Sequence, residues 1–144
     1  MVNSIKPGML VFVDTAPFIY FLEHNSEYHA TMVLFFNHAY DHGIQMITSA
    51  LTLTEICTKP YQLGKPTLAA KYREYFTNSE LLVLREVDGQ IADEAARIRA
   101  KHKLRTPDSI QLATANIVGA DVILTNDLAW QGKAKGKVIP LNTL

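Results

Sequence analysis

Four carboxylates in this sequence have the residue type and the placement to do chemistry. Asp14 follows five consecutive apolar residues at 9–13, and a charge in that position is costly to bury unless something pairs with it. Asp127 follows a second apolar segment, Asp108 lies at a predicted helix start, and Glu55 has apolar neighbours. Each also has an ordinary structural explanation, such as a helix dipole for Asp108. The four acids are therefore informative about function only as a set.

The chemistry that such a set supports is metal-assisted hydrolysis of a phosphodiester. Carboxylates that converge on one spot raise one another's pKa values unless a cation compensates their charge. Hard oxygen ligands select Mg²⁺ or Mn²⁺, which keep some of their waters. A divalent ion held in this way polarises a phosphoryl oxygen and activates a bound water. Spacing makes convergence plausible without proving it, so the candidate catalytic and metal-binding residues are Asp14, Glu55, Asp108 and Asp127.

The elements that would position these acids alternate between short apolar strands and helices. Strands are expected at residues 9–13, 45–48, 81–84, 121–125 and 138–141. Helices are expected at residues 17–23, 28–40, 50–59, 67–77, 88–103 and 107–118. This alternation predicts an α/β fold with a parallel sheet. Ligand sites in such sheets form outside the carboxyl ends of the strands, which is where Asp14 and Asp127 are expected.

Prolines and hydroxyl residues set three of the expected boundaries. Pro60 is predicted to end the helix that begins after Ser49. Thr106 is predicted to cap the helix that contains Asp108, with Pro107 as its first helical residue. Pro140 places the last strand at an edge of the sheet, because proline cannot donate a hydrogen bond to a neighbouring strand.

The length and composition predict one globular domain over residues 1–144. Hydrophobic residues make up 48% of the chain and charged residues 19%. The single cysteine, Cys57, excludes an internal disulfide. Neither a signal peptide nor an apolar stretch of the ~20 residues needed to span a bilayer is recognised, so a cytoplasmic protein without membrane contact is expected. The 14 basic and 14 acidic residues argue against a nucleic-acid binder held by overall charge.

Five segments, taken in their order and at their distances, resemble the PIN-domain family and, within it, the VapC-type toxins. The segments are residues 11–22, 52–56, 91–99, 106–115 and 122–127. The resemblance covers nearly the whole chain. Two departures leave the subfamily open. The segment 128–130 lacks the charged residues that many relatives have there, and about eight extra residues precede the first strand.

The resemblance implies a fold, a site and partners. The implied fold is a three-layer sandwich in which helices flank a parallel sheet of five strands. Asp14, Glu55, Asp108 and Asp127 would bind Mg²⁺ or Mn²⁺, and Thr15 and Thr125 would supply hydroxyl groups near the metal. Members of the family cut RNA, are commonly homodimers, and as toxins are blocked by a cognate antitoxin.

The basic residues are unevenly distributed, although the net charge is zero. Five of them fall within residues 97–105 and three within residues 133–137. The first group is typical of a solvated helix face. Because an acidic pocket repels RNA, some local positive surface is needed, and Lys103 and Arg105 are the candidates to steer RNA phosphates near the mouth of the site.

Three rival functions remain open at this point. Asp14 could be the nucleophile of a phosphatase or phosphoacceptor domain, but dehalogenase-like phosphatases need a second acid two residues later, where this chain has Ala16. A PIN-like fold without catalysis could serve as a binding module. A nuclease of this type could also process RNA as a housekeeping enzyme rather than act as a toxin.

Overall fold

A computed structural model of the chain describes residues 2–144. Its centre is one sheet of five parallel strands in the order β3-β2-β1-β4-β5. The strands are β1 Leu10–Val13, β2 Gln45–Ser49, β3 Leu82–Arg85, β4 Val122–Thr125 and β5 Lys137–Pro140. The chain runs outwards from β1 to β3 and then crosses to β4 on the other side of β1. This switch in strand order opens a crevice at the carboxyl ends of β1 and β4.

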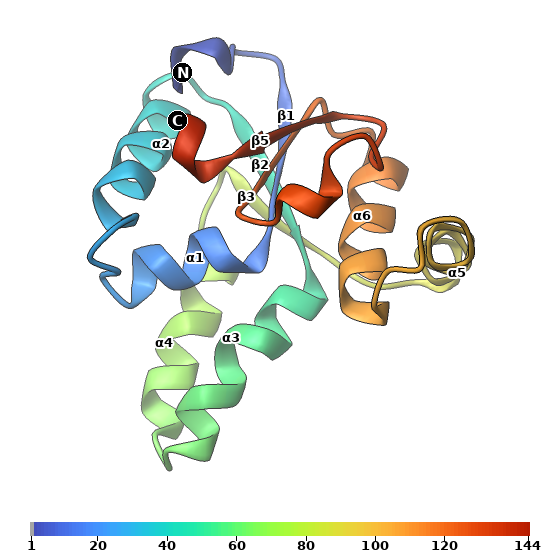
Figure 1. Cartoon of the computed structure of the whole chain (residues 1–144). Coiled ribbons are helices and arrows are strands. Elements are labelled where there is room, and N and C mark those ends of the chain that lie inside the picture. Colours follow the sequence, from blue (N-terminus) through green and yellow to red (C-terminus); the bar gives the residue numbers. More distant parts are fainter. Residues whose placement is uncertain (1) are drawn as a thin grey trace.

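Helices cover both faces of the sheet, which gives the expected three layers (Figure 1). They are α1 Thr15–Leu22, α2 His29–Asp41, α3 Ala50–Gln62, α4 Pro66–Thr77, α5 Gly89–His102 and α6 Thr106–Val118. Helices α5 and α6 lie on one side of the sheet and α1 and α2 on the other, while α3 and α4 form a hairpin that extends beyond it (Figure 1). The predicted parallel α/β fold is confirmed.

The continuous apolar run of β1 is buried on both faces, as the sequence predicts. Successive side chains of a strand point to opposite faces, so Val11 and Val13 join the core beneath α1, α2 and α4. Phe12 joins the other core, beneath α5 and α6. All three side chains are fully buried. The end of β1 is therefore held by packing on both faces, which fixes the backbone position of Asp14.

Two predicted helix boundaries are wrong. Pro60 lies inside α3 rather than ending it, because proline removes only its own N–H bond and the backbone N–H of Leu63 still donates to the Lys59 carbonyl at 3.0 Å. The helix ends before Gly64, which has a φ of 66°. Helix α6 begins at Thr106 with Arg105 in the capping position, so Thr106 is not the cap. The carbonyl of Arg105 accepts from the backbone N–H of Ser109, which starts the helix one residue early.

Three short 3₁₀ helices were not predicted from the sequence: η1 Val2–Ser4, η2 Leu128–Trp130 and η3 Leu141–Thr143. The second follows Asp127 directly and so bears on the candidate site. The edge position predicted for the strand that contains Pro140 is confirmed. Within residues 2–144, none of the helices combines the length and the apolar character that crossing a bilayer requires.

Candidate active site

The four predicted acids line one cleft at the carboxyl ends of the strands. The cleft has a volume of about 420 Å³. Its wall includes Asp14 after β1, Glu55 on α3, Asp108 in the first turn of α6 and Asp127 after β4. Other residues that line it are Thr15, Tyr20, Arg105, Gln111 and Asn126. Segments that are far apart in the sequence thus bring four carboxylates to one hollow.

Asp14 lies deepest among the four acids, and both of its carboxylate oxygens accept hydrogen bonds. The backbone N–H of Thr15 donates to Oδ1 at 2.7 Å, and the hydroxyl of Thr125 donates to Oδ2 at 2.8 Å. Burial raises the pKa of Asp14 to about 6, against the lowering effect of these bonds, and the charges of Glu55 and Asp108 raise the pKa further. Burial and the neighbouring acids therefore disfavour the charged form of Asp14, and a bound cation would favour it.

A buried network supports Asp14 and Glu55 from below. The amide nitrogen of Gln111 donates to the hydroxyls of Thr52 at 2.8 Å and Thr15 at 3.1 Å. The Thr15 hydroxyl donates to Oε1 of Glu55 at 2.9 Å. These five residues, Asp14, Thr15, Thr52, Glu55 and Gln111, are called the floor of the cleft below. Threonine and glutamine fix the carboxylates here because each can donate and accept within a confined space.

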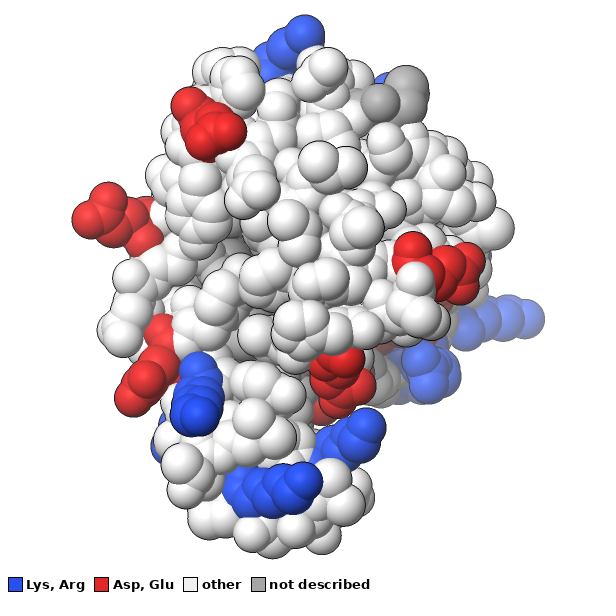
Figure 2. Space-filling model, turned by 90° about the vertical axis from the view of Figure 1, so that its left-hand side faces the viewer, with Lys and Arg blue, Asp and Glu red and all other residues white. Residues whose placement is uncertain are grey.

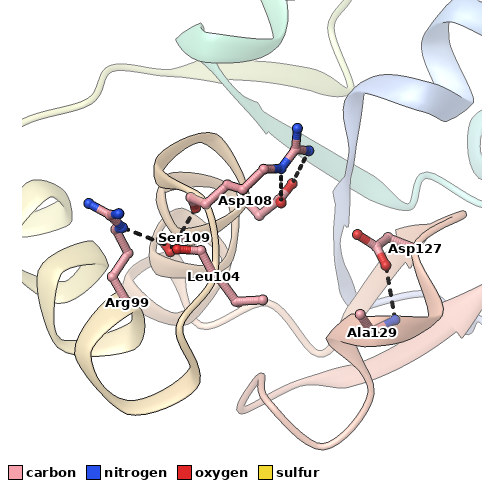
Figure 3. A network of polar contacts seen from close by, with 7 residues as sticks. Arg99, Leu104, Asp108, Ser109, Asp127 and Ala129 are labelled. Atoms are coloured by element: carbon pink, nitrogen blue, oxygen red, sulfur yellow. Dashed lines mark hydrogen bonds and ion pairs between the residues drawn. The ribbon is translucent and has the colours of Figure 1, made fainter.

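Asp108 and Asp127 form the rim of the cleft together with Arg105, and their contacts are local. Arg105 Nε lies 3.1 Å from Oδ2 of Asp108, which is in the first turn of α6. Asp127 caps η2, because its Oδ1 accepts from the backbone N–H of Ala129 at 2.9 Å (Figure 3). One positive side chain therefore stands at the mouth of an acidic cleft.

The other predicted site residues divide into those at the cleft and one away from it. The Thr125 hydroxyl donates to Asp14, whereas Thr15 contacts Asp14 through its backbone N–H and directs its hydroxyl to Glu55. Arg105 lines the cleft. Lys103 does not line the cleft: it ends α5 in a left-handed conformation with a φ of 55° and lines a separate hollow with Arg99 and Leu104.

Comparison with known families adds a decisive observation. The family model described as the PIN domain matches residues 11–136. The chain belongs to the PIN-domain family. The matched part contains β2, β3, β4 and all of β1 except Leu10, together with all four acids of the cleft, and it ends just before β5. Among curated proteins, none matches the sequence.

Solved structures share this PIN fold at low sequence identity. A DNA-bound VapBC from Salmonella typhimurium superposes with a TM-score of 0.72 at 19% identity, covering 92% of this chain and 98% of that one. FitAcB from Neisseria gonorrhoeae gives a TM-score of 0.69 at 19% identity, covering 93% of this chain and 99% of that one. The toxin VapC20 from Mycobacterium tuberculosis, described as cleaving the sarcin–ricin loop, gives 0.63 at 16% identity, covering 78% and 86%.

Residues of this PIN domain that sequence reasoning missed are polar side chains inside the site. Gln111 is 1% exposed on α6, where Ser109 and Thr114 are also buried, and a glutamine three residues after Asp108, among small and apolar residues, is the signal that could have revealed it. Thr52 stands three residues before Glu55 and gave no separate signal. Asn126 donates to the Tyr20 hydroxyl at 3.2 Å, which links the loop after β4 to α1.

The donor set fits a divalent cation, although the acids are not gathered into a coordination shell. Within the described residues 2–144, no group of three or more His, Cys, Asp and Glu side chains is placed to hold a metal ion as it stands. The reason is visible in the rim, where Asp108 faces Arg105 and Asp127 caps η2. The cleft nevertheless offers carboxylate oxygens and an under-compensated Asp14, which are what Mg²⁺ or Mn²⁺ prefers.

Proposed function

We propose that this PIN domain is a Mg²⁺- or Mn²⁺-dependent endoribonuclease, the cytoplasmic toxin of a toxin–antitoxin pair. The observation that carries the proposal is the meeting of Asp14, Glu55, Asp108 and Asp127 in one cleft at the strand ends. In this proposal the enzyme works as a homodimer and is held inactive by a cognate antitoxin. Family membership supports nuclease chemistry, and the VapBC and FitAcB structures support an antitoxin partner.

The four acids are proposed to hold the metal, which when bound polarises the phosphodiester and activates a water for attack. Asp14 is the central ligand because it is buried and both of its oxygens are oriented by donors, from Thr15 and Thr125. Glu55 is aimed into the cleft by the Thr15 hydroxyl. These donors hold the carboxylates in place before any ligand arrives, and such pre-organisation is what makes electrostatic catalysis effective.

Arg105 is proposed to exchange partners during the reaction. Its side chain is 80% exposed and faces Asp108 across 3.1 Å. When a cation occupies the acids, the guanidinium loses the advantage of that pairing and becomes available to an RNA phosphate at the mouth. A planar guanidinium suits this role because it binds phosphate oxygens through two parallel hydrogen bonds.

The direct test is cleavage of RNA by the purified protein. We expect cleavage with Mg²⁺ or Mn²⁺ and none with EDTA. Asp14→Asn should lower kcat/KM by about 1000-fold or more, because it removes the central charge that holds the metal. Far-ultraviolet circular dichroism should show an unchanged fold, and Asp93→Asn, on the exposed face of α5, should retain full activity.

Growth of expressing cells separates the rival functions. Wild-type expression should arrest growth and degrade RNA, whereas Asp14→Asn should do neither. Normal growth with intact RNA in both strains, together with an inert purified protein, would favour a binding module and overturn the nuclease proposal. RNA cleavage in vitro without growth arrest would favour a housekeeping nuclease over a toxin.

A further inference from the structure

A second hollow, opposite in charge to the cleft, lies between α5, α6 and the loop that precedes β5. Its volume is about 280 Å³, and it shares no lining residue with the cleft. The charged residues that line it are Glu94, Arg97, Lys101, Lys133 and Lys135, with His102 beside them, and it is called the basic pocket below. We propose that the basic pocket binds the sugar–phosphate backbone of RNA whose scissile bond lies in the cleft. The inference rests on the proposed ribonuclease function.

Part of the positive charge of the basic pocket has no ion-pair partner in the fold. Its one acid, Glu94, faces Arg97 at 3.3 Å, and Arg97 also pairs with Asp93 at 2.6 Å. Neither Lys101, Lys133 nor Lys135 has an ion-pair partner among the described residues. Like charges that are gathered without partners repel each other, so their clustering does not stabilise the folded chain. An anionic ligand would remove that repulsion.

The loop that carries two of these lysines is held in place. Gly136 packs so closely on the start of β4 that a Cβ atom there would collide with the Ala120 carbonyl oxygen. The backbone N–H of Lys135 donates to Asn116 Oδ1 at 3.0 Å, which ties the loop to α6. A helix dipole accounts for basic residues in the last turn of α5, but not for Lys133 and Lys135, which lie outside any helix.

Further basic side chains connect the basic pocket to the cleft. Arg99 Nε donates to the Leu104 carbonyl at 3.1 Å (Figure 3), and Arg99 and Lys103 line a third hollow beside Leu104. The next residue, Arg105, lines the cleft. Lys101 of the basic pocket, Lys103 of the third hollow and Arg105 of the cleft thus alternate along the end of α5 and the start of α6, and we propose this segment as the route of an RNA strand that leaves the cleft. By contrast, the face on the α1 and α2 side shows few charges above the α3–α4 hairpin (Figure 2).

The composition of the basic pocket favours contacts to phosphate over reading of bases. None of the residues that line it is Phe, Tyr or Trp, the side chains on which unpaired bases stack. Lysine contacts to phosphates fix the position of a strand without reading its sequence. Its small volume also suits a phosphate group better than a whole cofactor, since ligand pockets usually exceed about 300 Å³. The expected ligand is thus an RNA backbone of any sequence.

Binding in EDTA tests the basic pocket without cleavage. The probe is a fluorescent single-stranded RNA long enough to leave the cleft, titrated with Lys133→Gln/Lys135→Gln protein. We expect affinity about tenfold weaker at low salt, and a plot of log K against log salt that is less steep by about 1.4, since each lost phosphate contact accounts for about 0.7. The matched control is Lys65→Gln/Lys71→Gln, which removes two exposed lysines of the α3–α4 hairpin and should bind as the wild type does.

The outcomes separate this inference from the proposed function. With Mg²⁺ or Mn²⁺, the pocket variant should cleave a substrate of a few nucleotides normally and show a raised KM only on the long RNA. Equal RNA affinity of the pocket variant and the wild type, or an equal loss of affinity in the control variant, would contradict the proposal that the basic pocket binds RNA. If the pocket variant loses affinity for an acidic peptide but not for RNA, the ligand of the basic pocket is a protein and the RNA proposal is contradicted. If the wild-type protein does not cleave RNA but the pocket variant still binds RNA more weakly, the proposed nuclease function is contradicted and the proposed RNA-binding site is retained.

Discussion

In the floor of the cleft, side-chain hydrogen bonds join residues 37 to 97 positions apart in the sequence. In the rim they join residues two or three positions apart. Gln111 can reach Thr15 and Thr52 only when α6, α1 and α3 have all packed around the sheet. Asp108 and Asp127, by contrast, find their partners within a single turn of chain. The floor is thus a product of the whole fold, and the rim a product of local sequence.

Because of this difference, we expect the floor and the rim to have different roles in the reaction. The side-chain nitrogen of Gln111 and the hydroxyl of Thr15 donate hydrogen bonds within the floor, although the buried Oε1 of Gln111 has no partner among the described residues. These long-range bonds orient Asp14 and Glu55 before a ligand is present. The exposed contacts of the rim are weak and exchange partners at little cost. Asp108 can therefore leave Arg105, and Asp127 can use its second oxygen, when a cation enters. We expect the floor to set the rate of the reaction and the rim to tune affinity.

The largest effect should come from Gln111→Leu, which removes the donor at the centre of the floor. It leaves the Thr15 and Thr52 hydroxyls short of a partner, at a cost of about 1–3 kcal/mol in the free energy of unfolding. Displaced carboxylates should also lower kcat/KM by about 10- to 100-fold, as is typical when the groups that orient metal ligands are lost. Urea denaturation and initial cleavage rates measure the two effects.

Thr114→Val provides the matched control for the floor. Thr114 is also fully buried on α6, but its hydroxyl donates to the Ile110 carbonyl within the same helix. Loss of this hydroxyl should lower the free energy of unfolding by about 1 kcal/mol and leave kcat/KM unchanged. If both variants lose activity in proportion to their stability, the floor is ordinary core packing and the distinction between floor and rim fails.

The second effect concerns the charge of Asp14. Its pKa rises from 3.8 to about 6 on folding, so between these pH values the folded protein binds a proton that the unfolded chain releases. In EDTA the free energy of unfolding should therefore fall as pH rises from 4 to 6, by about 2 kcal/mol. Asp14→Asn should remove most of this slope, and Mn²⁺ at pH 7 should restore stability to the wild type alone. A slope that survives in the variant would show that other groups produce it.

Most of the fold was predictable because its signals are local. The apolar run of β1, the alternation of strands with helices and the edge strand with Pro140 each depend on neighbouring residues and on general rules for parallel sheets. The same rules place Asp14 and Asp127 at one edge of the sheet, because both follow parallel strands, but they make the convergence of Glu55 and Asp108 on that edge only plausible. The boundaries at Pro60 and Thr106 were wrong because single residues were given more weight than the hydrogen bonds that continue around them.

The floor was not predictable, because its partners meet only in three dimensions. Nothing near Gln111 in the sequence shows that it contacts residues 59 and 96 positions away. The same limit explains Lys103, whose nearness to Arg105 in sequence suggested a place at the mouth. The left-handed turn at the end of α5 directs it to another hollow. Side-chain direction at a helix end depends on the capping conformation, which a single sequence does not settle.

The smallest effect on stability, and the sharpest test of the rim, is expected from Arg105→Ala. Its pair with Asp108 is exposed, so the free energy of unfolding should change by less than about 0.5 kcal/mol. Removing a positive charge that competes for Asp108 should tighten Mn²⁺ binding a few-fold, measured by calorimetry, while KM for RNA rises. Arg97→Ala, which removes the exposed arginine that pairs with Asp93 and Glu94 on α5, should leave Mn²⁺ affinity unchanged. Weaker Mn²⁺ binding in Arg105→Ala would mean that Arg105 orients Asp108 for the metal instead of competing with it, and the rim would then belong with the pre-organised floor.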